Sequence, residues 1–260
     1  MKISISFYSL KNLSDISNGQ ELLNILSSYG LVIEKAGEYE PIRKDFAPSD
    51  LPEIWKGRCD IDSSYRTCSF LFKGKGELRF SGMASWSLNI HPNSKSFEGV
   101  HLWLNVPRKY DISKLIRLAD DLFIWSEAVY GYITENSKKI SKIFIKKNNH
   151  SVSIGNVYSG IPSLMWLNYF GPPYLNETDF HLPNDNTRVG HGIRLVLTET
   201  PNDERLSNLN FLKSYIDYIG AEWFFQFEKI DGEVGVLKEG TQSHTKRIPV
   251  FDNSAIVRRF

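Results

Sequence analysis

The chain has 260 residues, of which 41% are apolar and 13% aromatic, so it can bury a sizeable core if it folds as one unit. Its 31 basic and 30 acidic side chains leave a formal net charge of +1, which argues against nucleic acid or an anionic membrane as the default partner. The apolar run after Met1 is short and interrupted, and no stretch approaches about 18 apolar residues, so we expect a cytoplasmic protein without a signal peptide or a membrane span.

The first predicted elements are a strand, a helix and a second strand. Residues 2–8 and 31–42 are predicted strands on either side of a predicted helix at 19–30. Residues 66–92 then predict two or three strands of a meander, interrupted by the sequence KGKGE at 73–77.

The clearest strand–helix–strand module spans residues 100–135. Residues 100–107 alternate as in a strand, and 128–135 predict the returning strand. Between them, 111–127 show the spacing of an amphipathic helix, with Asp111 placed to cap its first turn. An amphipathic helix of this length must cover a sheet. The residues of its apolar face are Ile112, Leu115, Ile116, Ala119, Leu122 and Phe123.

A second copy of the module is predicted towards the end of the chain. A helix at 206–220, capped by Ser207 or Asn208, is flanked by predicted strands at 192–200 and 221–229. Its apolar stripe consists of Leu209, Leu212, Tyr215, Ile216 and Ile219.

Two stretches between the modules are less regular. Residues 141–162 combine a basic segment with turn signals, and 171–190 are rich in Pro, Asn and Asp, which predicts a long irregular surface connection. The whole pattern predicts an α+β fold of repeated strand–helix–strand modules, with helices packed on an antiparallel or mixed sheet. Ferredoxin-like or related split modules are the sharper interpretation. We expect one globular domain over 1–260, with two lobes meeting near residue 150 as the alternative.

Residues 164–173 form a dense apolar run that ends abruptly. Two consecutive prolines cannot continue a helix or a central strand, and Gly171 can adopt the positive φ of a sharp exit. We interpret this stretch as a buried structural corner, with an aromatic ligand cage as the alternative. The motif comprises Trp166, Asn168, Tyr169, Phe170, Gly171, Pro172 and Pro173.

The residues most often used in metal or acid–base chemistry form no recognisable site. Without a secretory signal, Cys59 and Cys68 are expected to stay unbridged, and two thiols cannot complete a tetrahedral zinc site alone. Asp120 and Asp121 are adjacent on a predicted helix and point about 100° apart, so they cannot act as a matched acid and base. We expect no metal, no cofactor and no catalytic residue. The histidines, which lack ligand spacing, are His91, His101, His150, His181, His191 and His244.

Three charged segments also have simple structural interpretations. The GKGE sequence at 74–77 lacks the phosphate-loop arrangement and predicts a hairpin turn. Asp60 and Asp62 resemble the start of a calcium loop, but the glycine and final acidic residue that such a loop needs are missing. The lysines between 138 and 147 could form a nucleic-acid patch, but the neutral total charge favours a water-facing strand or helix edge.

The sequence G-x-P-x-L-x-W-x-N-Y-F-G-P-P-Y at 160–174 resembles the signature of bacterial immunity proteins of polymorphic and type VI toxin systems. The resemblance is to the immunity protein 52 family and the related type VI immunity family. The segment VYGYIT at 129–134 is similar to a second element of these families, and the likeness covers roughly residues 100–180. It implies a protein that binds and neutralises a cognate toxin, and it transfers no catalytic residues.

The first functional hypothesis is therefore an immunity protein that works by stoichiometric binding and not by turnover. We expect the irregular connection from Asn176 to Asn186 to contact the toxin, since long polar loops often carry binding. Its candidate residues are Asn176, Glu177, Asp179 and Asp185. Inhibitors of nucleases are often acidic, so a net charge of +1 argues that the toxin is not a strongly basic nuclease.

Two other hypotheses stay open at the sequence level. One is an enzyme whose site joins distant residues, such as His191 with Asp179 or Glu199. The other is a sugar- or peptide-binding module with exposed aromatic side chains. Burial of all three of Trp103, Trp166 and Trp223 would exclude that module.

Overall fold

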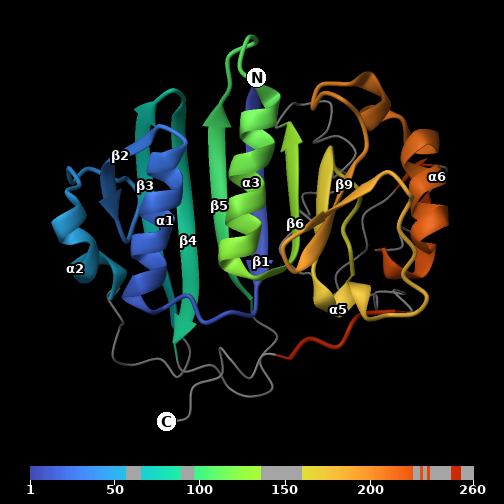
Figure 1. Ribbon diagram of the computed structural model, residues 1–260, viewed down its shortest axis with the longest axis horizontal. Helices are drawn as coiled ribbons and strands as arrows, with labels where there is room; N and C mark the ends of the chain where they lie inside the picture. Colours follow the sequence, from blue (N-terminus) through green and yellow to red (C-terminus); the bar gives the residue numbers. More distant parts are fainter. Residues whose placement is uncertain are drawn as a thin grey trace.

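The described residues form one large antiparallel sheet with helices (Figure 1). The computed structural model describes residues 1–56, 66–88, 97–135, 160–224, 229–230, 233–234 and 247–252. The strands are β1 (Lys2–Ser9), β2 (Leu31–Gly37), β3 (Arg66–Gly76), β4 (Arg79–Leu88), β5 (Glu98–Asn105), β6 (Ala128–Glu135), β7 (Leu167–Phe170), β8 (Asn186–Val189), β9 (Gly192–Val196), β10 (Lys229–Ile230) and β11 (Glu233–Val234). The helices are α1 (Ile16–Ser28), α2 (Leu51–Trp55), α3 (Ile112–Ser126), α5 (Pro172–Leu175) and α6 (Leu209–Ile219), with 3-10 turns η1 (Pro48–Asp50), η3 (Glu204–Ser207) and η4 (Ala221–Trp223).

The strand order explains how the modules are assembled. Within the described residues, nine strands pair in the order β2-β3-β4-β5-β1-β6-β7-β9-β8, and each neighbouring pair is antiparallel. Strands β5 and β6 both pair with β1, so they run parallel to each other on its two sides, with α3 connecting them. This is a split strand–helix–strand module, and the α+β prediction is confirmed.

Strand β1 lies at the centre of the sheet and is buried along almost its whole length. Ile3, Ile5 and Phe7 face the core beneath the helices, while Ser4 and Ser6 face the opposite side of the sheet. The small serine side chains fit between larger groups on the neighbouring strands. A strand that is covered on both faces is buried at nearly every position, in contrast to an edge strand.

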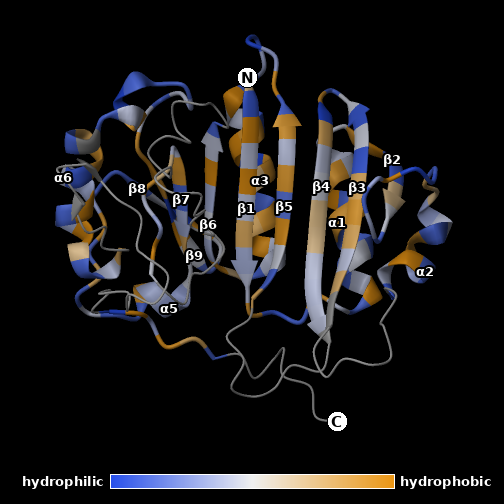
Figure 2. Ribbon diagram, turned by 180° about the vertical axis from the view of Figure 1, so that it is seen from behind, coloured by the Kyte–Doolittle hydropathy of each residue, from blue (hydrophilic) through white to orange (hydrophobic). Residues whose placement is uncertain are grey.

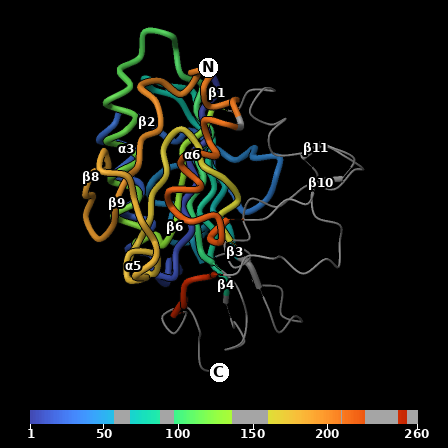
Figure 3. The backbone as a smooth tube through the Cα atoms, turned by 90° about the vertical axis from the view of Figure 1, so that its right-hand side faces the viewer, coloured from blue at the N-terminus to red at the C-terminus, as the bar shows by residue number. Residues whose placement is uncertain are grey.

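Helices α1 and α3 cover one face of the sheet, where they lie side by side (Figure 1). Asp15 and Asp111 cap them by accepting hydrogen bonds from backbone N–H groups two residues later. Leu115 and Leu122 of α3 are fully buried, as the helical stripe predicts. Figure 3 shows the molecule from the side, with α3 on one side of β1 and β6. None of the described helices is long and apolar enough to cross a membrane.

The aromatic corner is formed by β7, Gly171 and the short helix α5. Trp166, Tyr169 and Phe170 are at most 1% exposed, and the Asn168 side chain bonds both the N–H and the carbonyl of Met165. The expectation of a positive φ at Gly171 is wrong, since its φ is −89°.

Glycine is needed at position 171 for a different reason. A Cβ atom there would lie 2.5 Å from the carbonyl oxygen of Ala128, so the chain passes too close to β6 for any side chain. Pro172 and Pro173 end the strand, but Pro172 also begins α5, where a missing backbone donor carries no cost.

Three other predictions are corrected by the structure. The connection at 171–190 is not wholly irregular, because it contains α5 and the edge strand β8. The strand predicted at 221–229 begins instead as the 3-10 turn η4, because Gly220 adopts a φ of 114° and turns the chain. Helix α6 forms as predicted but packs on η3 and η4 at the end of the sheet; Leu212 is buried and Ile216 only partly.

The division of the chain near residue 150 remains a prediction. Strand β6 before this point pairs directly with β7 after it, so one sheet contains strands from both sides. Other predictions fall on residues outside the described ranges. These are Cys59, Asp60, Asp62, His91, His150, His244, the lysines between 138 and 147, and most of the segment 141–162.

Candidate binding surface

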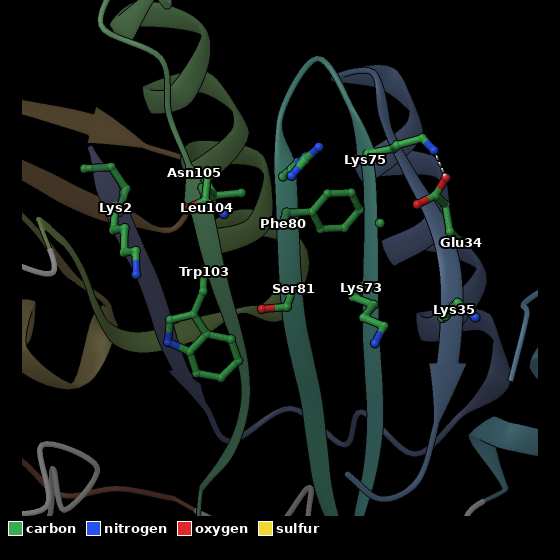
Figure 4. Close-up of a pocket in the computed structure, with 13 residues that line it drawn as sticks. Lys2, Glu34, Lys35, Lys73, Lys75, Phe80, Ser81, Trp103, Leu104 and Asn105 are labelled. Carbon is green, nitrogen blue, oxygen red and sulfur yellow. Dashed lines mark ion pairs between the residues drawn. The ribbon is translucent and has the colours of Figure 1, made fainter. Parts of the chain in front are cut away.

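A broad hollow lies on the face of the sheet opposite α1 and α3. Figure 2 shows this face, where none of the described helices crosses β3, β4 or β5. The hollow has a volume of about 640 Å³ and is lined by side chains from β1, β2, β3, β4 and β5 (Figure 4). We call it the basic hollow, and its main polar and aromatic residues are Lys2, Lys73, Lys75, Arg79, Trp103 and Asn105.

Strand register brings these distant residues together in two rows. Arg79 of β4 lies opposite Asn105 of β5, which in turn lies opposite Lys2 of β1. Because alternate residues of a strand share a face, the positions two residues away form a second row. That second row consists of Lys73, Ser81, Trp103 and Ser4.

An irregularity in β2 adds further charge to the hollow. The pairing with β3 shifts between Ile33 and Lys35, so two consecutive residues, Glu34 and Lys35, both lie outside the core. At Gly74 of β3, a Cβ atom would lie 1.9 Å from the carbonyl oxygen of Val32. Glycine therefore allows the close approach of β2 and β3 that forms this side of the hollow.

The lining of the hollow is strongly one-sided in charge. It contains five basic side chains and one acidic side chain, Glu34. Lys75 pairs with Glu34 at 2.7 Å, and Lys35 pairs with Asp45 at 3.0 Å. Among the described residues, no ion pair involves the remaining basic side chains, which are Lys2, Lys73 and Arg79.

Trp103 gives the hollow an accessible aromatic surface. Its side chain is 42% exposed, although tryptophan usually hides most of its apolar ring. His101, two residues earlier on the same face, lies behind it with the ring centroids 6.4 Å apart. Burial lowers the pKa of His101 to about 4, so this histidine is neutral near neutral pH. The positive charge of the hollow thus comes from lysine and arginine side chains.

The polar loop proposed from the sequence as a toxin contact is held against the rest of the fold. Phe180 in its middle is buried, and Asp179 forms an ion pair with Arg247. The Trp223 indole nitrogen also donates to the carbonyl oxygen of Asp179 at 3.4 Å. Asn176 and Asp185 are exposed together with Asp179, while Glu177 is partly buried. The loop is thus an accessible but anchored surface.

The structure does not bring together the residues suggested for an enzyme. His191 stacks on Phe123 with the ring centroids 4.5 Å apart, and its Nε2 lies 3.0 Å from the Ala128 carbonyl oxygen. Asp179 is paired elsewhere, with Arg247. Glu199 follows the far end of β9, a five-residue strand about 16 Å long that begins beside His191.

The remaining candidate residues with described positions are distributed over several elements of the fold. Trp166 and Trp223 are buried, but Trp103 is exposed, so the condition that would exclude a peptide-binding module is not met. Asp120 and Asp121 point to different partners, Arg194 and Tyr29 respectively. Cys68 is buried in the core. Across the described ranges, no group of three or more His, Cys, Asp or Glu side chains is placed to hold a metal ion.

Comparison with known proteins gives a likeness in fold. No protein-family model and no curated protein matches this sequence. Among solved structures, the chain is similar to the Pseudomonas aeruginosa T6SS protein PA0821, with a TM-score of 0.51 and 14% sequence identity. The similarity covers 84% of this chain and 75% of that chain. At this identity the comparison supports a shared fold.

Sequence reasoning missed the basic hollow because its residues come from five strands. The sequence KGKGE predicts a turn, but β3 continues to Gly76 and β4 begins at Arg79, so only Glu77 and Leu78 lie in the turn between them. The alternating lysines at 73 and 75 were the available signal, because alternation in a strand puts both on one face. What could not be inferred was that Arg79, Trp103 and Lys2 would join them there.

Proposed function

We propose that this chain is a bacterial immunity protein that binds a cognate toxin and neutralises it by forming a stoichiometric complex. The observation that carries the proposal is the likeness in fold to PA0821, a protein of a type VI secretion system. The motif at 160–174, which resembles the type VI immunity families, supports it independently. We also propose that the chain belongs to the type VI immunity families, on the basis of the motif at 160–174, and that it acts in the cytoplasm.

The surfaces of the protein favour a binding function over catalysis on a small substrate. His191 and Asp179, two of the residues suggested for catalysis, have separate structural partners. The accessible features are instead a charged hollow on a sheet and an anchored polar loop. Such surfaces suit recognition of another protein, which requires complementary shape and charge and no reactive group.

The test of this function uses the toxin encoded beside the gene for this protein. Titration calorimetry of the purified pair should give a stoichiometry of about one to one, and co-expression should restore growth of cells that make the toxin. Inhibition by trace amounts of this protein that increases with incubation time would instead indicate turnover, and the enzyme hypothesis would replace the proposal.

The loop at 176–186 remains our sequence-based candidate for a toxin contact. Replacing Asp185 by alanine removes an exposed carboxylate and should weaken toxin binding about tenfold if the loop enters the interface. Glu21→Ala on the exposed side of α1 is the matched control and should bind as the wild type does. Equal affinities for both variants would remove Asp185 from the interface and leave the stoichiometric function unaffected.

A further inference from the structure

We propose that the basic hollow is the docking surface for an acidic segment of the toxin, whose Asp and Glu side chains enter between Lys73, Arg79 and Lys2. This inference rests on the proposed function and extends it, because it assigns a surface and a chemistry to the partner. The fold places the hollow on β1 to β5. The polar loop follows α5 and packs against Trp223, so it is a separate surface.

Charge complementarity is the first argument for an acidic partner. Register places Lys35 directly opposite Lys73, and like charges opposed across a sheet are destabilising. Lys35 is neutralised by Asp45, but the exposed Lys73 and Arg79 have no ion-pair partner among the described residues. A carboxylate brought by a partner would supply the missing counter-charge for Lys73 and Arg79 and form charge-assisted hydrogen bonds.

The exposed tryptophan is the second argument, because it indicates a protein partner. Trp103 lies in the row between Ser81 and Ser4, with Arg79, Asn105 and Lys2 in the adjacent row, as Figure 4 shows in part. An aromatic ring beside unpaired cations suits a peptide segment that combines carboxylates with apolar atoms. Tryptophan and arginine are also the side chains that most often dominate the energetics of protein interfaces.

The dimensions of the hollow agree with a chain segment. Its lining residues come from five adjacent strands, so it extends about 19 Å across the sheet at the usual strand spacing. An extended peptide of about six residues covers this distance. A net charge of +1 for the whole chain also makes a nucleic acid the less favoured occupant.

The experiment measures the affinity of the toxin encoded beside this gene for charge-reversal variants of the hollow. Arg79→Glu should weaken binding about tenfold, and Lys73→Glu combined with Arg79→Glu about a hundredfold, because each change replaces attraction by repulsion. Trp103→Ala should also weaken binding about tenfold. All three side chains are exposed, so thermal melting of the variants should match that of the wild type.

A matched control has the same change of charge elsewhere on a strand. Arg188 is exposed on the edge strand β8, so Arg188→Glu should leave toxin affinity unchanged. Salt provides a second readout, because added NaCl should weaken wild-type binding more than it weakens binding by the double variant. Equal losses for Arg188→Glu and Arg79→Glu would overturn the proposal, since they would reflect total charge and not the hollow.

The outcomes separate this inference from the proposed function. If the wild type binds the toxin and the hollow variants bind equally well, the hollow is not the interface and the immunity function stands. If the wild type fails to bind the toxin, the immunity function is wrong, and a ten-residue glutamate peptide then tests the hollow alone. Weak binding of this peptide that is lost in the double variant supports an acidic occupant; tighter binding of a single-stranded oligonucleotide overturns it in favour of a nucleic acid.

Discussion

Phe170 shows how a single side chain connects several parts of the core. Its ring lies 5.8 Å from Tyr130 on β6, 5.8 Å from Tyr174 on α5 and 5.0 Å from Phe180 in the polar loop. It is fully buried, so removing it leaves a cavity among rings that cannot all move inwards. Strand β6, helix α5 and the polar loop therefore all pack against the Phe170 ring.

We predict that Phe170→Ala lowers the free energy of unfolding by about 3 to 5 kcal/mol, the usual cost of truncating a buried aromatic side chain. Tyr169→Ala should have a similar effect, because Tyr169 is also fully buried. Denaturant unfolding measures both, with Tyr39→Ala as the control because Tyr39 is 61% exposed. Wild-type stability with loss of toxin binding would instead make this corner a recognition surface.

His101 predicts a pH dependence of stability with a definite sign. Burial lowers its folded pKa to about 4, whereas its ordinary value is 6.5. Between these values the unfolded chain takes up a proton that the folded chain does not, so stability is lost as the pH falls. At pH 5 we expect a loss of about 1 to 2 kcal/mol from this residue relative to pH 8.

The measurement compares denaturant unfolding at pH 5 and pH 8. His101→Gln should have a smaller difference between the two values than the wild type, because glutamine does not titrate. His181 is exposed, and His181→Gln should keep the wild-type difference. An unchanged difference in His101→Gln would show that another group causes the acid sensitivity.

At the level of elements, an ion pair connects α3 to β9. Arg194 pairs with Asp120, whose other carboxylate oxygen accepts from the Tyr169 hydroxyl at 2.9 Å. The side chains of the pair are only 15% and 20% exposed, so water screens their attraction poorly. This link fixes the helix that covers the sheet against a strand about 75 residues later in the chain.

We predict that Asp120→Ala lowers the free energy of unfolding by about 2 to 4 kcal/mol, because it leaves Arg194 largely buried without its anion. Arg194→Met together with Asp120→Ala should cost less than the sum of the single changes. A double-mutant cycle measures this coupling. The exposed pair Lys213–Asp217 on α6 is the control, and its coupling energy should be below about 1 kcal/mol. Strict additivity at Asp120 and Arg194 would contradict a direct interaction.

At the level of the whole molecule, the sheet predicts a gradient of stability. Strand β1 has a hydrogen-bonded neighbour on each side, while β2 and β8 are at the edges of the described sheet. Backbone groups at an edge open without disturbing the core, but those of β1 open only when much of the sheet separates. The most and least protected amides should therefore follow strand order and not chain order.

Native-state hydrogen exchange tests this gradient. We expect the slowest exchange in β1 and its neighbours β5 and β6, and the fastest strand exchange in β8. Because β6 pairs with β7, the parts of the sheet before and after residue 150 should open together. Independent exchange of these two parts would instead support two lobes, the alternative that the sequence left open.

Much of the fold could be predicted from sequence because its signals are local. The pattern at 111–127 and the cap at Asp111 identified α3 almost to its ends. The strands at 2–8, 100–107 and 128–135 were likewise visible, since alternation and turn residues act over a few positions. Predictions were wrong where one local pattern is compatible with two structures. The apolar residues from 221 predict a strand but begin as the turn η4.

By itself, the sequence determined the α+β class, the two principal helices, a hairpin close to residues 73–77 and the burial of the aromatic corner. Only the tertiary structure decided the strand order, and with it the basic hollow, the exposure of Trp103 and the pairing of Asp120 with Arg194. The physical reason is the separation along the sequence between the residues that interact. Helical and strand patterns depend on neighbours within a few residues, whereas pairing β1 with β5 aligns segments about 100 residues apart. Register then determines which charges share a face, and that choice is made by burial of the whole core.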